Sequence, residues 1–206
     1  MTRTSRRMVI AALALAPAGC SGLLGGGGPP TALYTLTALR DFSANGPPLK
    51  LEILIDRPTS SDALDTVRIA LRRNQLSFDY FADSAWTDPA PRMVQGLLVD
   101  SLQRSGRVTA VSRDTLAIRG DYELRIELRH FEAEYTGDAP LPTVRIELGL
   151  ILVRVENRAV VGTRTVVTSG HPAKNDIPSI VAAFDEALHA AMRDTLTWML
   201  AAAESR

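Results

Sequence analysis

After residue 30, apolar and polar residues alternate along most of the chain with the period of two that indicates β-strands. The clearest alternation covers residues 122–130, where the apolar residues would share one face and the charged residues between them the other. His130-Phe131 breaks this alternation, which predicts a bulge or a strong twist at that point. Similar patterns predict further strands at residues 33–37, 49–55, 66–71, 76–81, 108–111, 144–155 and 159–168.

Two other stretches follow the helical period of 3.6 residues. The first begins near Pro91 and ends at Gly106, a residue type that commonly follows a helix end. The second opens at Asn175-Asp176-Ile177-Pro178 and carries an apolar stripe from Ile180 to Met199. We therefore predict one α+β domain over residues 31–206, in which a mainly antiparallel twisted sheet packs against one short helix and one long C-terminal helix.

The first 20 residues follow a different pattern, that of an export signal. Three arginines precede an apolar run from Met8 to about Ala18, and the small residues Ala18-Gly19 then precede Cys20, the only cysteine. This order is similar to a bacterial lipobox, although Pro17 stands where leucine is usual. It predicts a lipoprotein signal peptide at residues 1–19, cleavage between Gly19 and Cys20, and acyl chains such as palmitate on the Cys20 thiol and new amine. The alternative is an ordinary signal peptide cut elsewhere, which would leave a free thiol.

Residues 20–30 are predicted to be the lipidated cysteine and a tether, because Gly25–Gly28 and Pro29-Pro30 favour an extended linker over a packed element. Two or more acyl chains hold a protein stably on a bilayer, whereas one holds it only marginally. Ser21 follows the cysteine, at the position where aspartate retains enterobacterial lipoproteins in the inner membrane. The sequence thus predicts a lipid-anchored protein facing the periplasm from the outer membrane, with anchoring in the inner membrane as the alternative. Ser5–Ile10 also resembles part of a twin-arginine signal, so the export route stays open.

The charge of the chain argues against a nucleic-acid partner. The 23 basic and 23 acidic residues balance, and without Arg3, Arg6 and Arg7 the chain after residue 19 has 20 basic residues against 23 acidic ones. A net charge of −3 gives a phosphate backbone no electrostatic attraction.

No residue pattern predicts catalysis, a metal or a cofactor other than the lipid on Cys20. The Gly25–Gly28 run lacks the Gly-Lys-Ser/Thr of a phosphate-binding loop. His130, His171 and His189 are far apart in the sequence and do not have the spacing of metal ligands. Ser169-Gly170-His171 brings together residue types of a hydrolase, but neighbours in sequence do not form a catalytic triad.

Two tryptophans, Trp86 and Trp198, are candidates for partner contacts, since tryptophan offers a large contact area at low entropic cost. For Trp86 the alternative is a side chain that fixes the entrance of the first helix onto the core, and the same ambiguity holds for Trp198.

The assembled pattern resembles the ABC-type transport auxiliary lipoprotein family, which includes PqiC-like lipoproteins. The residues that carry the resemblance extend over nearly the whole mature chain. They are Tyr34-Thr35-Leu36, Leu54-Ile55-Asp56-Arg57-Pro58, Val67-Arg68-Ile69, Ala85-Trp86-Thr87-Asp88, Asp121-Tyr122-Glu123-Leu124 and the helix around Ala182–Leu188 with Trp198.

The resemblance implies a non-catalytic accessory of an MCE-type ABC system that moves lipids between the inner and outer membranes. Its partners would be an MCE-domain protein and the ABC permease and ATPase subunits, and a homo-oligomer is compatible with it. Two other hypotheses stay open at this point. One is a periplasmic lipid carrier with its own acyl-chain cavity, and the other is a lipoprotein hydrolase that uses Ser169 and His171.

Overall fold

The computed structural model describes residues 31–42, 46–113, 119–137 and 139–205. The predicted signal peptide, Cys20 and the tether lie outside these residues. The described chain forms nine strands and two helices. The strands are β1 (Ala32–Tyr34), β2 (Leu49–Ile55), β3 (Thr59–Ser60), β4 (Arg68–Asn74), β5 (Ser77–Trp86), β6 (Val108–Ser112), β7 (Tyr122–Glu134), β8 (Thr143–Arg154) and β9 (Val160–Gly170); the helices are α1 (Ala90–Ser105) and α2 (Ile177–Glu204).

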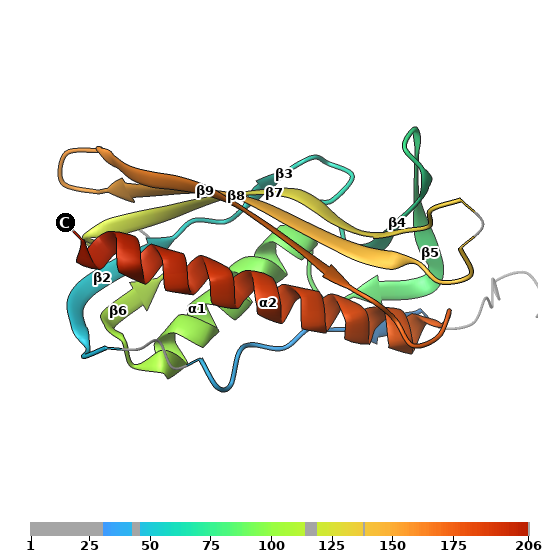
Figure 1. The fold of residues 1–206 in the computed structure, drawn as a ribbon, viewed down its shortest axis with the longest axis horizontal. Coiled ribbons are helices and arrows are strands. Elements are labelled where there is room, and N and C mark those ends of the chain that lie inside the picture. The colour runs from blue at the N-terminus through green and yellow to red at the C-terminus, as the bar shows by residue number, and fades with distance from the viewer. Residues whose placement is uncertain (1–30, 43–45, 114–118, 138, 206) are drawn as a thin grey trace, which may run out of the picture. The chain divides into compact units, whose positions relative to one another are not determined.

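Strand β7 organises the sheet, because it pairs with other strands along both of its edges (Figure 1). One edge pairs antiparallel with β8 over its whole length, and β8 pairs antiparallel with β9. The other edge pairs in turn with β2, β3 and β4, all of them parallel to it. β6 then extends the sheet beyond β2, and β5 and β1 extend it beyond β4.

The prediction of a mainly antiparallel sheet is therefore only partly right, because the sheet is mixed. The strands joined by short connections, β4–β5, β7–β8 and β8–β9, pair antiparallel as hairpins must. The other five pairings, β1–β5, β2–β6, β2–β7, β3–β7 and β4–β7, are parallel. Parallel neighbours need long crossover connections, and hydrophobic alternation locates a strand without identifying its neighbour.

Most local predictions are confirmed. The helix that ends before Gly106 is present, and Gly106 has φ +63°, the left-handed conformation that glycine adopts without strain. Helix α2 begins after Asp176, whose carboxylate accepts a hydrogen bond from Ser179 N at 2.8 Å. The pairing of β7 with β8 shifts between Leu128 and His130, where the alternation predicts a bulge. In contrast, β1 is shorter than predicted, and Thr59–Ser60 forms a strand where a loop is expected.

Both helices pack against one side of the sheet, with α2 along β8 and β9 and α1 along β2 and β6 (Figure 1). The inward side chains of the sheet join those of the helices in one hydrophobic core, built entirely from residues between Leu36 and Ala203. Residues 31–206 thus form a compact unit with its own core. In the described part of the chain no helix is both long and apolar enough to span a bilayer.

Candidate functional site

A hollowed surface lies on the side of the sheet that the helices leave open. Strand β7 contributes several of its charged side chains, because its alternation points Glu123, Arg125, Glu127 and Arg129 outward. These charges are paired along the strand: Arg125 holds Glu123 through two contacts of 2.9 and 3.0 Å, and Arg129 Nε lies 2.7 Å from Glu127. Across the strands, Arg129 lies 3.7 Å from Glu147 of β8. The sequence favours a solvated sheet face here, and the pairing agrees with it.

A groove of about 660 Å³ runs over this open face, between the segment that follows β2 and the middle of β9. Gly149 leaves room for the Arg129 side chain, which lies across this glycine, because a Cβ there would come within 2.8 Å of the guanidinium. The floor is partly apolar, since Ile151 is 40% exposed. The groove walls carry Asp56, Arg57, Arg125, Glu127, Arg129 and Arg164. Charges of both signs and an apolar floor suit a protein or amphiphile contact better than a simple anion.

Asp56, in the wall of this groove, is a titratable group near neutral pH. Its pKa is raised from 3.8 to about 6, chiefly because burial disfavours the charged carboxylate, and next because its side chain hydrogen-bonds to Glu123. The pKa of Glu123 is lowered, first by its hydrogen bond with Arg125. The pair therefore holds one proton more readily on Asp56 than on Glu123.

We expect Asp56→Asn to stabilise the domain at pH 7 and to leave its stability at pH 4 nearly unchanged. Between pH 4 and pH 6 the folded protein binds more protons at Asp56 than the unfolded chain does, so this group's contribution to stability falls as the pH rises. Asparagine removes that loss, and the gain is below about 1 kcal/mol because the group is partly solvated. Urea unfolding of residues 31–206 at both pH values measures the difference.

The matched control is Asp65→Asn, since Asp65 pairs with exposed Arg57 at 2.6 Å. It should change stability by less than about 0.5 kcal/mol at either pH. An Asp56→Asn variant that is less stable than wild type at pH 7 would contradict the assignment.

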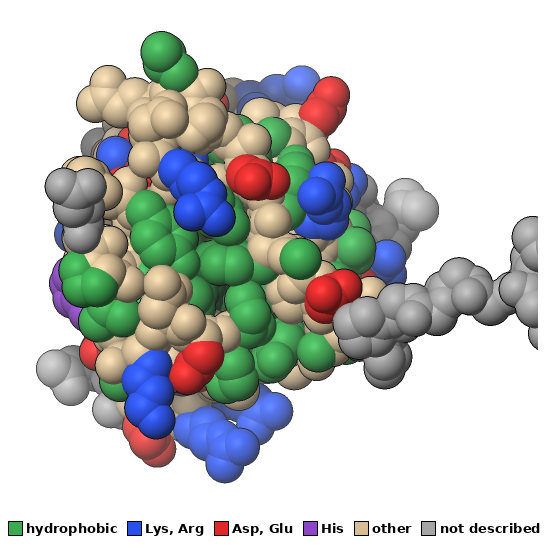
Figure 2. Space-filling view, turned by 90° about the vertical axis from the view of Figure 1, so that its right-hand side faces the viewer, with side chains coloured by type: hydrophobic (Ala, Val, Ile, Leu, Met, Phe, Trp, Pro, Cys, Tyr) green, Lys and Arg blue, Asp and Glu red, His purple; other side chains and the backbone are tan. Residues whose placement is uncertain are grey.

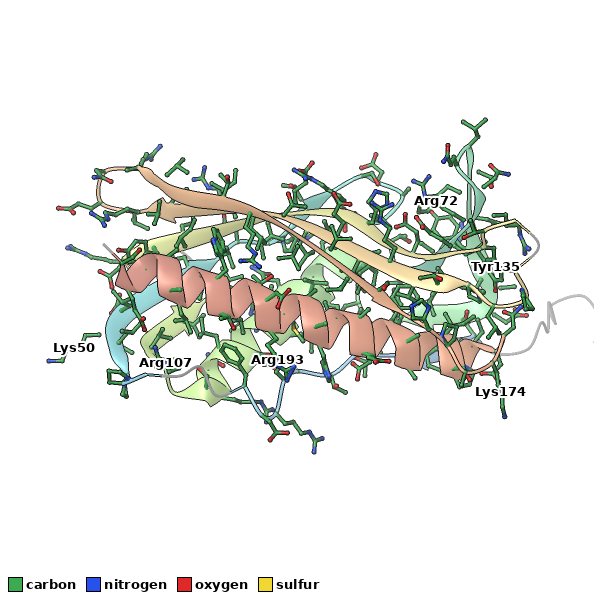
Figure 3. All side chains as sticks on the ribbon, viewed as in Figure 1. Lys50, Arg72, Arg107, Tyr135, Lys174 and Arg193 are labelled. Atoms are coloured by element: carbon green, nitrogen blue, oxygen red, sulfur yellow. The ribbon has the colours of Figure 1, made fainter. Side chains whose placement is uncertain are left out.

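A second polar cluster lies where β4 pairs with the C-terminal end of β7, near the labelled Arg72 and Tyr135 (Figure 3). Glu132 is only 1% exposed, and its carboxylate contacts Arg72 Nε at 3.0 Å and His130 Nδ1 at 2.6 Å. His130, Glu132 and Glu134 bring one potential metal ligand each within 4.8 Å of one another. Arg72 and, at 3.8 Å, Arg145 already supply positive charge to these carboxylates. The carboxylates of the cluster thus already have cationic partners, although Arg145 lies closer to Glu147, at 2.7 Å.

The sequence analysis did not identify this cluster, although the spacing His130-x-Glu132-x-Glu134 on a strand places all three residues on one face. Its prediction that the chain binds no metal stays a prediction.

In the described part of the chain, a hydroxyl, a carboxylate and an imidazole come together at the start of the domain, in a network that holds two segments together. Thr37 Oγ1 lies 2.9 Å from Asp185 Oδ2 and 2.9 Å from His189 Nε2, and Thr37 N donates to Asp185 at 2.7 Å. The carboxylate therefore contacts the hydroxyl and the backbone instead of orienting the imidazole as a catalytic triad requires. This network fixes the segment after β1 onto α2. Ser169 and His171, the hydrolase candidates from the sequence, are exposed and share no hydrogen bond.

The two tryptophans of the sequence analysis occupy different environments. Trp86 is 1% exposed and packs edge-on against Phe184 and Phe131, with ring centroids 5.3 and 6.0 Å apart. It fixes the chain before α1 onto the core, so the structure favours the core position over the partner contact among the two interpretations of the sequence. Trp198 is half-buried on α2 and faces β9, where a Cβ on Gly162 would lie 3.4 Å from its ring. Gly19 and Cys20 lie outside the described residues.

Comparison with known proteins gives consistent matches over most of the chain. A family model described as the ABC-type transport auxiliary lipoprotein component matches residues 34–194. An uncharacterized protein of Bradyrhizobium diazoefficiens is 30% identical over 187 residues, which are 90% of this chain and 49% of that protein. The chain thus spans about half the length of this relative.

Solved structures agree with the fold. The crystal structure of a Xanthomonas campestris protein of the family DUF330 is 28% identical, with a TM-score of 0.78 over 84% of this chain and 97% of that one. A second crystal structure, of an uncharacterized protein, has a TM-score of 0.63 at 14% identity and covers 83% of this chain and 99% of the other. At that identity the second likeness concerns the fold alone.

Proposed function

The chain belongs to the family of ABC-type transport auxiliary lipoprotein components, and from this premise we propose that it is a non-catalytic accessory of an ABC system that moves lipids across a bacterial envelope. The observation that carries the proposal is the family match. It covers residues 34–194, which include β7, β8, β9, all the residues that line the groove and most of α2. An auxiliary component acts by binding and positioning other chains, so it needs a shaped surface and an anchor instead of a reaction centre.

The polar groups of the described residues suit that role. The outward charges of β7 are neutralised in pairs, and the one meeting of threonine, aspartate and histidine holds a segment onto α2. We propose that its partners are an MCE-domain protein, which would carry the lipid, and the ABC permease and ATPase. The open face of β7, β8 and β9, with its groove of about 660 Å³, is the surface that we assign to this contact.

The anchor in this proposal is Cys20, acylated at its thiol and its new amine, and Ser21 directs the lipoprotein to the outer membrane. We expect Cys20→Ser to lose incorporated palmitate, to leave the membrane fraction and to fail to restore envelope integrity in a strain that lacks the gene. The physical reason is that removing every acyl chain removes the roughly 0.8 kcal/mol per buried methylene that holds the protein on the bilayer.

Ser21→Asp is the matched variant, because it keeps the thiol and the acyl chains. It should retain palmitate and move the protein to the inner-membrane fraction. A Cys20→Ser protein that still labels with palmitate, or that fully restores envelope integrity from the soluble fraction, would contradict the anchored role.

A further inference from the structure

Exposed apolar side chains gather at one end of the domain. Leu33, Val67, Leu76 and Leu141 are 66%, 40%, 100% and 38% exposed, and they account for four of the seven large hydrophobic side chains that the described residues expose. Figure 2 views this end and shows apolar surface across its middle, with both basic and acidic side chains around and among it. We call the surface around these four residues the end face. Large exposed apolar patches on soluble proteins mark contacts with other proteins or with membranes.

Four separate segments build the end face. Leu33 lies on β1, which pairs with β5, and the Val67 carbonyl accepts a hydrogen bond from Trp86 N at 2.7 Å. Leu141 lies in the β7–β8 turn, which Asn175 ties to the chain before α2 by a bond of 3.1 Å to the Pro140 carbonyl. Leu76 is in the turn of the β4–β5 hairpin, which projects from the same end in Figure 1.

The hairpin behind Leu76 has the composition of a membrane-interface segment. Phe78 and Tyr80 are half-buried and pack edge-on with ring centroids 5.6 Å apart. The Arg68 guanidinium lies 3.6 Å above the Tyr80 ring, and that of Arg72 lies 5.2 Å from the Phe78 ring. Aromatic rings occupy the headgroup level of a bilayer, while arginine can extend its charged end to the phosphates and keep its stem in apolar surroundings.

The position at which the described chain begins indicates that a membrane is what contacts the end face. Thr31 directly precedes β1, so the chain that leads back to Cys20 starts at the end face. Cys20 and Thr31 are 11 positions apart, and such a length of chain spans at most about 36–40 Å when fully extended. Helix α2 has 28 residues, which is about 42 Å, and it runs from the end face to the opposite end of the domain (Figure 1). An acyl chain on Cys20 therefore reaches a bilayer at the end face easily, whereas a bilayer at the opposite end lies at or beyond its limit.

We propose that the end face rests on a phospholipid bilayer, with Leu33 and Leu76 entering the headgroup layer and Arg68 facing lipid phosphates. The inference rests on the lipidation of Cys20 in the proposed function. It orients the long axis of the domain, along α2, away from the membrane. The open face of β7, β8 and β9 then extends from the bilayer into the periplasm, where a partner can reach it.

The test uses residues 31–206, which form a compact unit and contain no cysteine. An N-terminal histidine tag on vesicles of phosphatidylethanolamine, phosphatidylglycerol and a nickel-chelating lipid takes the place of the acyl chains. Leu33→Cys and Leu76→Cys each receive an environment-sensitive fluorophore. Val160→Cys is the matched control, because Val160 is 57% exposed and lies at the start of β9, outside the end face. We expect brominated lipids to quench the fluorophore at positions 33 and 76 and to leave that at position 160 unchanged.

A second measurement uses the unlabelled double variant Leu33→Ser/Leu76→Ser. Its partition onto the same vesicles without the nickel lipid should fall by at least roughly tenfold relative to Val160→Ser, because two leucines lose their apolar transfer. Quenching at position 160 but not at 33 and 76, or equal partition of the two variants, overturns the proposal. A shift in the emission of the fluorophore at position 76 in the absence of vesicles also overturns the proposal, because a second copy of the chain would then cover the end face. The vesicle assay contains no transport subunit, so a negative result would not contradict the accessory role. Conversely, failure to find transport partners in cells would not contradict membrane contact by the end face.

Discussion

Replacing Phe184 by alanine should lower the free energy of unfolding of residues 31–206 by about 3–5 kcal/mol, which is the range for truncating a buried phenylalanine. Phe184 is fully buried on α2, and its ring centroid lies 5.3 Å from that of Trp86 and 5.1 Å from that of Phe131. These three rings join α2 to β5 and β7. The cavity left by the truncated side chain would therefore open where the helix meets these two strands. Domains of this size have about 5–15 kcal/mol of stability in total.

Urea unfolding followed by circular dichroism measures this loss, with Leu76→Ala as the control. Leu76 is fully exposed, so its truncation should change the stability by less than about 0.5 kcal/mol. A loss below about 1 kcal/mol for Phe184→Ala would mean that α2 is not seated on the three-ring cluster.

Gly170→Ala should cost about 3 kcal/mol, at the upper end of what overpacking costs. Gly170 ends β9 where the strand meets α2, and a Cβ there would lie 2.1 Å from the Ala183 carbonyl oxygen. Backbone atoms of a helix cannot rotate aside as a side chain can. The methyl group would therefore push α2 away from β9, together with Phe184, the residue that follows Ala183.

Gly162→Ala is the matched control because it lies on the same strand. A Cβ there would lie 3.4 Å from the Trp198 ring, which is an ordinary contact, so the change should stay within about 1 kcal/mol. Equal effects at the two glycines would contradict the close approach of α2 to β9. Hydrogen exchange of the first turns of α2 would show whether the loss is local to the helix start.

The sequence predicted the elements of the domain better than their arrangement. The alternation in β7 and β8 located both strands and their shared bulge, because side chains of period two report directly which face is buried. It could not show that β2, β3 and β4 line up one after another along a single edge of β7. That order depends on crossover connections, and those leave no local pattern.

The candidate site shows the same limit. The outward charges of β7 could be read from the alternation, whereas the groove depends on β7, β8, β9 and the segment after β2 lying side by side. Asp56 follows β2, and only the parallel pairing of β2 with β7 brings it to Glu123. Trp86 was open between a partner contact and a core position, and its burial depends on Phe184, which lies 98 positions later in the chain.

The end face and the open face would divide the work of an accessory lipoprotein between them. The end face would hold the domain on the membrane from which the anchor extends, and the open face would present paired charges and a groove to a partner.

The measurement that tests the accessory role most directly is site-specific photo-crosslinking in living cells from the groove, with the full lipoprotein carrying a photoreactive amino acid in place of Ile151. Val160 serves as the control position, since both side chains are exposed but only Ile151 lies in the groove. The captured proteins and lipids are then identified by mass spectrometry. The account predicts that position 151 captures an MCE-domain protein or a subunit of an ABC transporter and that position 160 does not. Capture of neither at position 151, under conditions in which the transport genes are expressed, would contradict it.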